Sequence, residues 1–130
     1  AVSSRRAAEM GKRSRTKGRH FEQEFATILR ERFGDDSKDR GVRRGIQSRG
    51  GGKEAADVTC DALPWAHFEC MHGKKPNIRA KLMQAEADVL DPMASAVVAV
   101  AVVKFDREEP IVAMRLSDWL NLVKDAYPGG

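Results

Sequence analysis

The stretch that decides the fold runs from residue 55 to residue 71 and reads AADVTCDALPWAHFECM. Residues 55–61 and 66–71 are rich in apolar side chains, and the segment between them contains Leu63-Pro64-Trp65. Short apolar runs on either side of such a turn are typical of a β-hairpin. We therefore predict two paired strands at the centre of this chain.

Two acidic residues lie in these otherwise half-apolar strands. Side chains alternate between the faces of a strand, so Asp57 and Glu69 can meet on one side of the pair, with Met71 next to Glu69. Buried carboxylates need a partner, and a metal ion is one such partner. A third acid, Glu22, follows Phe21 on a predicted helix and can reach the edge of the sheet. Such a set of carboxylates suits Mg²⁺, which takes one or two of them together with waters and phosphate oxygens.

Helices and further strands are expected on both sides of the hairpin. Residues 96–103 are almost wholly apolar, as expected of a central strand covered on both faces. Apolar residues at helical spacing predict the helices. The expected elements are a helix over 18–33, a short strand over 42–48, the hairpin strands, a helix opened by Pro76, strands over 96–103 and 111–115, and a closing helix capped by Ser117 and ending near Tyr127. The predicted order is α-β-β-β-α-β-β-α.

The composition indicates one soluble globular domain, expected over residues 18–127, because 130 residues with 42% hydrophobic and 32% charged side chains fit a single core. Residues 1–20 carry seven basic side chains against the single acid Glu9, while the rest of the chain is slightly negative. We expect residues 1–17 to form a flexible basic arm that binds a polyanion, most commonly nucleic acid. For residues 1–9 a solubilising tail or a remnant from outside the natural protein is an equal alternative, since Met10 reads well as a native start.

The two cysteines, Cys60 and Cys70, are too few for a disulfide scaffold and predict reduced thiols in a reducing compartment such as the cytoplasm. His67 and His72 flank Cys70, but the paired spacing of a structural zinc site is missing. The longest apolar run is half a membrane span, and no signal peptide is visible, so no membrane association is expected.

Four short motifs carry a resemblance to a known family. They are Gly18-Arg19-His20-Phe21-Glu22, Ala56-Asp57-Val58, Phe68-Glu69-Cys70-Met71 and Gln84-Ala85-Glu86. In this order and spacing they resemble the PD-(D/E)XK nuclease superfamily, and most closely its archaeal and phage-type Holliday junction resolvases. The resemblance covers about residues 17 to 115. It implies an α/β fold with a restriction-endonuclease-like αβββαβ core, in which a mixed central sheet is flanked by helices.

The resemblance also implies roles for individual residues. Glu22, Asp57 and Glu69 would bind Mg²⁺, for which Mn²⁺ would substitute. Gln84 would orient the site from the second helix, and Ser48 would lie near the scissile phosphate. The implied activity is a magnesium-dependent endodeoxyribonuclease that resolves four-way DNA junctions by phosphodiester hydrolysis, leaving a 5′ phosphate and a 3′ hydroxyl.

Two positions depart from the family pattern. Ala56 replaces a proline, which affects only the entry to the strand. Met71 stands where the family has its lysine, and a thioether can neither donate a proton nor carry charge. We expect the activity to be lost or impaired, and three explanations stay open: an engineered inactive variant, which we favour, a naturally inactive binder, or a site in which Lys53, Lys74 or Lys75 takes over.

Basic side chains in the arm and around the site are expected to neutralise DNA phosphates, with little regard to base sequence. They are Lys12, Arg13, Arg15, Lys17, Arg19, Arg43, Arg44, Arg49, Lys53, Lys74, Lys75 and Arg79. A four-way junction needs two symmetric cuts, so a homodimer is expected. Trp119, Leu120, Leu122 and Val123 of the closing helix are candidates for its surface, and ordinary packing onto the sheet is the alternative, expected for at least half of them.

Three other functions are weighed against junction resolution. The first keeps the fold and changes the substrate to flaps, nicks or duplex DNA. The second is a catalytically inactive, structure-selective DNA-binding protein. The third, an RNA-binding domain, is disfavoured because only 6% of the residues are aromatic and no stacking platform is evident.

Overall fold

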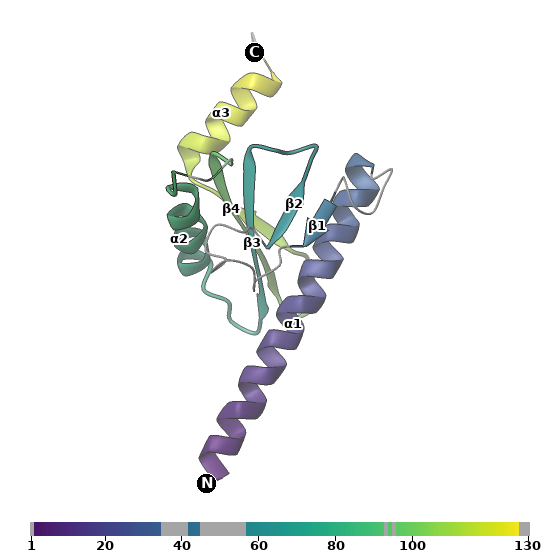
Figure 1. Cartoon of the computed structure of the whole chain (residues 1–130), viewed down its shortest axis with the longest axis vertical. Coiled ribbons are helices and arrows are strands. Elements are labelled where there is room, and N and C mark those ends of the chain that lie inside the picture. Colours follow the sequence, from purple (N-terminus) through teal and green to yellow (C-terminus); the bar gives the residue numbers. More distant parts are fainter. Residues whose placement is uncertain (1, 35–41, 45–56, 93, 95, 128–130) are drawn as a thin grey trace.

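The computed structural model describes residues 2–34, 42–44, 57–92, 94 and 96–127, and for residues 2–15, 43 and 44 it describes the backbone only. The described part is an α/β fold with one mixed sheet and three helices (Figure 1). The elements follow one another as the sequence predicted: α1 (Val2–Phe33), β1 (Val42–Arg44), β2 (Val58–Cys60), β3 (Ala66–Gly73), α2 (Ile78–Val89), β4 (Val98–Phe105), β5 (Ile111–Ala113) and α3 (Leu116–Ala126).

The five strands lie in the order β1-β2-β3-β4-β5. Only β3 and β4 are parallel, because α2 connects them as a crossover, and the other neighbouring pairs are antiparallel. Val58 of β2 lies opposite Phe68 of β3, so the predicted hairpin is present. The strand β2 is much shorter than β3. On its other side, β3 pairs with β4 over its whole length.

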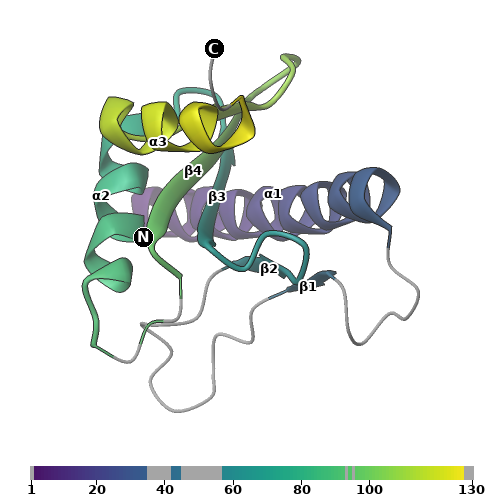
Figure 2. The ribbon, with the colours of Figure 1, turned by 90° about the horizontal axis from the view of Figure 1, so that it is seen from above.

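The sheet has a helix on each face. α1 runs past β3, β2 and β1 on one side (Figure 2), where Phe21 and Phe25 pack against Phe68 and Cys70. α2 covers the other side, where Leu82 and Ala85 pack against alternate residues of β4. The central strand β4 is therefore buried on both faces, as its apolar sequence predicted.

The ends of several elements differ from the prediction. α1 begins at Val2 rather than at residue 18, so residues 2–17, expected as a flexible arm, are helical. Their sequence contains alanines, lysines and arginines and no proline, and such residues sustain a helix without a core to pack on. This half of α1 projects beyond the sheet (Figure 1).

The caps of the other two helices also differ. α2 begins at Ile78 and is not opened by Pro76. Its N-cap is Asn77, whose side chain accepts a hydrogen bond from the backbone N–H of Ala80 at 3.0 Å. The N-cap of α3 is Arg115 rather than Ser117, and its side chain instead forms two hydrogen bonds, at 2.8 and 2.7 Å, with Glu86 of α2.

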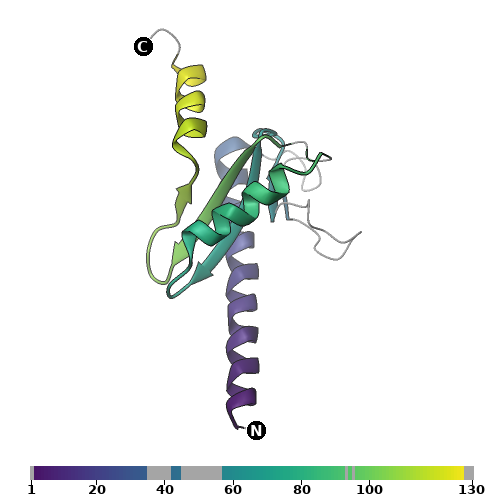
Figure 3. The same ribbon diagram turned by 90° about the vertical axis from the view of Figure 1, so that its left-hand side faces the viewer.

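The closing helix α3 contains no buried residue. It leads away from the sheet towards the C-terminus (Figure 3). Trp119 and Leu120 are each 50% exposed, whereas Leu122 is half-buried beside a shallow hollow formed with Trp65, Val97 and Val98. Packing onto the body of the domain thus involves only part of this apolar helix. None of the helices in the described ranges has the length and apolar character needed to cross a bilayer.

Candidate metal and phosphate site

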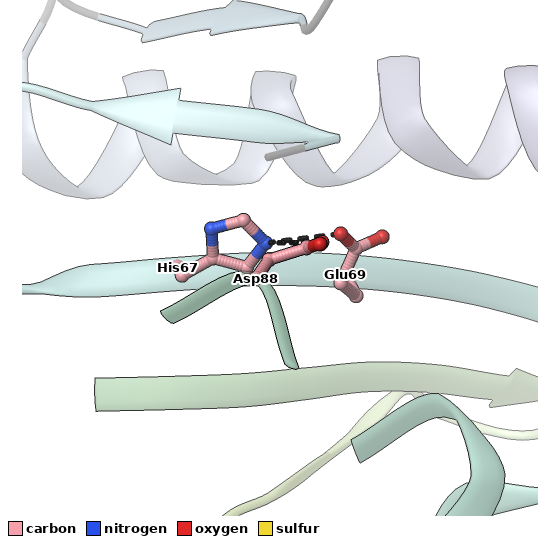
Figure 4. A group of neighbouring side chains, drawn as sticks. All are labelled: His67, Glu69 and Asp88. Atoms are coloured by element: carbon pink, nitrogen blue, oxygen red, sulfur yellow. Dashed lines mark hydrogen bonds and ion pairs between the residues drawn. The ribbon is translucent and has the colours of Figure 1, made fainter. Parts of the chain in front are cut away.

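Glu69 lies near the middle of β3, on the face that α2 covers, and only 2% of it is exposed. Its Oε1 lies 2.9 Å from Nε2 of His67, two residues earlier on the same face. Nε2 of His67 also lies 3.3 Å from Oδ2 of Asp88 on α2 (Figure 4). Because ionised carboxylates only accept hydrogen bonds, a protonated Nε2 serves both acids and fixes the orientation of Glu69.

The second oxygen of this carboxylate is not satisfied in the same way. Oε2 of Glu69 is buried and has no hydrogen-bond partner among the described residues. The ammonium nitrogen of Lys81, on α2, lies 3.9 Å from it, which is an ion-pair distance rather than a hydrogen bond. A buried carboxylate oxygen in this condition calls for a positively charged partner, and a bound cation can be that partner.

Asp57 stands opposite Glu69, directly before β2. Its backbone N–H donates to the carbonyl of Phe68 at 3.0 Å, and its Oδ2 accepts from the backbone N–H of Cys70 at 2.8 Å. Val58 is paired with Phe68, so the antiparallel register carries Asp57 to the position facing Glu69. The two acids therefore come together as the sequence predicted.

Burial and the charge of Asp57 both raise the pKa of Glu69. Burial raises the pKa of Glu69 to about 7; the hydrogen bond with His67 opposes this, and the charge of Asp57 adds to it. Burial would lower the pKa of His67, but its hydrogen bond with Glu69 and the charges of Glu69 and Asp88 outweigh that effect and raise it. A divalent cation between Asp57 and Glu69 would relieve the repulsion between them.

Glu22 lies on α1, which packs on the face of β3 opposite to the one that carries Glu69. It is half-buried and follows the fully buried Phe21. The pKa of the Cys70 thiol responds to the charge of Glu22. Burial raises this pKa most, the charges of Asp57, Glu22 and Glu69 raise it further, and the charge of Lys81 lowers it. The three predicted ligands, hereafter the acidic cluster, thus all influence the pKa of one residue of β3. Their ligand atoms do not form a group within 4.8 Å of one another, as those of His67, Glu69 and Asp88 do.

A hollow of about 410 Å³ opens beside the acidic cluster. It is lined by Gly18 of α1, residues 70–76 at the end of β3, and Lys81 of α2. Three of its lining residues are lysines, namely Lys74, Lys75 and Lys81, and we call it the basic hollow. Met71 lines it as well, half-buried and on the face of Glu69. None of the three acids lines this hollow, and Lys81, whose Nζ lies 3.9 Å from Oε2 of Glu69, connects the hollow to them.

Gln84 is exposed on α2, and its Oε1 accepts a hydrogen bond from Nζ of Lys81 at 3.3 Å. Gln84 therefore contacts Glu69 only indirectly, through Lys81. Sequence reasoning missed His67, Lys81 and Asp88 as site residues. A signal was present: Lys81, Gln84 and Asp88 share one face of α2, and His67 shares a strand face with Glu69.

The predicted DNA-binding residues are distributed unevenly. Arg19, Lys74, Lys75 and Arg79 are exposed. Lys17 is exposed too, but its Nζ pairs with Asp106 at 3.0 Å, and the other oxygen of Asp106 lies 2.9 Å from Nε2 of His72. Lys12, Arg13 and Arg15 lie on α1, and Arg43 and Arg44 on β1, where the structure describes the backbone only. Ser48, Arg49 and Lys53 lie outside the described residues, as does Ala56.

A second way to bind a metal uses His67, Glu69 and Asp88, whose ligand atoms lie within 4.8 Å of one another. In this group, however, Nε2 of His67 is already within 3.3 Å of both carboxylates, so a metal would have to replace two contacts. Cys70 does not add to such a site, because it is buried against α1 on the opposite face of β3. The group fits better as the support that orients Glu69.

Comparison with protein-family models, curated proteins and solved structures gives no match for this chain.

Proposed function

We propose that this chain is a metal-dependent, structure-selective DNA endonuclease of the restriction-endonuclease-like class, acting on four-way junctions. The observation that carries the proposal is Oε2 of Glu69, a buried carboxylate oxygen without a hydrogen-bond partner among the described residues. It belongs to the residue opposite Asp57 and lies 3.9 Å from Nζ of Lys81, which lines the basic hollow. Acids that converge next to ammonium groups suit a cation and a phosphate together.

In this proposal some side chains bind the metal and others orient those ligands. Glu69, Asp57 and Glu22 would hold Mg²⁺, which supplies charge neutralisation at the phosphate and an acidified water. His67 and Asp88 keep Glu69 in one orientation, and the N–H of Cys70 does the same for Asp57. Such supporting hydrogen bonds are what hold a ligand set in productive geometry.

Substrate binding is assigned to the basic hollow and its surroundings. Lys74 and Lys75 are exposed at its rim, and Arg79 is exposed on the first turn of α2. These residues would contact backbone phosphates, which gives affinity that is salt dependent and insensitive to base sequence. Selectivity for junctions over linear duplex rests on the family resemblance of the four sequence motifs.

Two symmetric cuts in a junction call for a homodimer, and the apolar C-terminal edge is its proposed surface. β5 is one of the two edge strands of the sheet, and with α3 it exposes large apolar residues: Ile111, Val112, Leu116, Trp119 and Leu120. Free, buried Cys60 and Cys70 fit a reducing compartment, and the proposed location is the cytoplasm of a prokaryotic or phage-infected cell.

The experiment uses one labelled sequence presented as a four-way junction, a flap and a linear duplex, with Mg²⁺ or with a chelator. The proposal expects slow cleavage of the junction in Mg²⁺, none with the chelator, and loss of cleavage in Glu69→Gln but not in the exposed control Glu108→Gln. Equal binding and cleavage of all three substrates would refute the junction assignment. Cleavage that survives in Glu69→Gln would refute the site.

A second candidate function is a DNA-binding protein without catalysis. Met71 favours it, because a thioether lines the basic hollow where an ammonium would act on the phosphate. Met71→Lys discriminates between the two candidates. A faster Mg²⁺-dependent cleavage in this variant supports the endonuclease, whereas tight junction binding without cleavage in both proteins supports the binder.

A further inference from the structure

Lys81 of α2 lies where an ammonium group could contact a phosphodiester bound at the proposed site. Nζ of Lys81 lies 3.9 Å from Oε2 of Glu69 and 3.3 Å from Oε1 of Gln84, and only 16% of its side chain is exposed. Most lysines keep their ammonium group in water. Lys81 instead extends over the sheet towards a buried carboxylate, in a segment of helix whose neighbours Leu82 and Ala85 are core residues.

Lys81 also lies close to Met71. Both residues line the basic hollow, and both adjoin Glu69: Met71 two residues further along β3, and Lys81 through its ion pair. The side chain at position 71 brings no charge. Lys81 brings one from the facing helix, and among the described lysines it is the one that the structure pairs with the buried Glu69.

The other lysines of the hollow are placed differently. Lys74 and Lys75 follow the end of β3 and are exposed. Their ammonium groups suit phosphates further along a strand of DNA, where contacts with the backbone are made in water. Of the lysines that line the hollow, Lys81 is the one that contacts the acidic cluster.

We propose that Lys81 supplies the ammonium group that position 71 lacks, binding a non-bridging oxygen of the scissile phosphate. This inference rests on the proposed endonuclease function. In the reaction a water oxygen bonds to phosphorus, the bond from phosphorus to O3′ breaks, and one water proton reaches the O3′ leaving group through solvent. Lys81 keeps its protons and stabilises the negative charge that builds on the phosphate.

A purely structural alternative is that Lys81 only balances the charge of Glu69. The two roles predict different results when a lysine at position 71 is combined with the loss of Lys81. If Lys81 serves the phosphate, a lysine introduced at position 71 replaces it, because both side chains end in the same hollow. If it serves only Glu69, stability falls in Lys81→Met and the activity depends on folding alone.

The test compares the unaltered protein with Lys81→Met, Met71→Lys and the double variant Lys81→Met/Met71→Lys, using a labelled synthetic four-way junction and Mg²⁺. Methionine keeps the length and the apolar stem of lysine, so the packing of α2 is preserved. Lys75→Met is the matched control, because it removes one ammonium from the same hollow. Thermal unfolding and junction affinity are recorded for every variant.

The inference expects measurable cleavage by the unaltered protein and a loss of about a hundredfold in Lys81→Met, the size of one removed electrostatic contact to a transition state. Junction affinity should fall no further than in Lys75→Met, and the double variant should recover cleavage. Lys81→Met that cleaves like Lys75→Met overturns the inference. So does a double variant that folds, binds the junction and stays as slow as Lys81→Met.

Two outcomes separate this inference from the proposed function. If the unaltered protein is silent and Met71→Lys cleaves, the metal site stands and Lys81 does not supply the missing charge. If both are silent although they bind the junction, the endonuclease function itself falls, and the inference falls with it.

Discussion

The two faces of β3 are buried to a similar degree and have opposite chemistry. Towards α1 the strand presents Ala66, Phe68 and Cys70, each at most 6% exposed, and they belong to the larger apolar core. Towards α2 it presents His67 and Glu69, which are no more exposed. Burying a charged pair costs free energy that apolar residues of the same size would not cost. We propose that the polar face is kept for the metal site rather than for stability.

The neighbouring strand β4 sharpens this comparison, because α2 covers it as well. Ala99, Ala101 and Val103 lie beside His67, Glu69 and Met71 in the parallel register, and they form an apolar core with Leu82 and Ala85. The same helix thus packs against an apolar strand and against a polar one. The surface under α2 changes from apolar to polar between the adjacent strands β4 and β3. On β3, Asp88 and Lys81 of α2 contact His67 and Glu69.

The largest effect is expected on the apolar face, from Phe68→Ala. Phe68 is buried and makes an edge-to-face contact with Phe25 at 5.1 Å between ring centroids. Its loss should lower the free energy of unfolding by about 3 to 5 kcal/mol, measured by urea denaturation. Phe33→Ala, at a 49% exposed position, is the control and should change it by less than about 0.5 kcal/mol. Equal effects of the two changes would contradict the assignment of the core.

On the polar face, Glu69→Gln should act on Mg²⁺ and spare the fold. The amide keeps the shape of the side chain and removes the charge of an anionic ligand. We expect the cleavage rate to fall by at least about a hundredfold, which corresponds to about 3 kcal/mol, and the Mg²⁺ affinity measured by calorimetry to fall as well. Mg²⁺ affinity equal to that of Glu108→Gln would contradict the ligand role.

The polar face should also make stability depend on pH in the absence of metal. Burial raises the pKa of Glu69 from 4.5 to about 7, so between these values the folded chain keeps a proton that the unfolded chain has lost. The free energy of unfolding therefore falls as pH rises through this range, by about 3 kcal/mol in total. The raised pKa of His67 contributes with the same sign, because its charge is lost above its folded pKa.

Urea denaturation between about pH 5 and pH 8 with a chelator measures this slope. Glu69→Gln should flatten it, and saturating Mg²⁺ should restore stability at the upper end, since a ligand that binds the folded state stabilises it. A slope that is unchanged in Glu69→Gln would show that another group is responsible.

The smallest effect on stability is expected at the exposed end of the molecule, from Leu120→Ser on α3. Because Leu120 is 50% exposed, the unfolding free energy of the monomer should change by about 0.5 kcal/mol or less. Sedimentation should nevertheless show a dimer converted to monomer, with Lys124→Ser on the same helix as the control. A dimer that persists in Leu120→Ser would move the interface elsewhere.

Local pattern was sufficient to predict the hairpin, the element order and the meeting of Asp57 with Glu69, because alternation and turn chemistry act over a few residues. The partners of Glu69 were not predicted. Lys81 and Asp88 reach the site only once α2 is laid across β3, and that placement depends on tertiary packing. His67 lies two residues from Glu69 on the same strand face, and its role was overlooked rather than hidden. The start of α1 was wrong for a related reason: an apolar stripe marks where a helix packs, and the helix itself continues further.

The account depends on a cation held between Asp57 and Glu69. The most direct measurement is the anomalous scattering of a crystal soaked in Mn²⁺. We predict one or two peaks bounded by carboxylate oxygens of Asp57 and Glu69, with Glu22 on the α1 side, and with the contact between His67 and Oε1 of Glu69 retained. A peak between His67 and Asp88 with Asp57 left out, or no peak near β3 at a concentration that supports binding in solution, would contradict it.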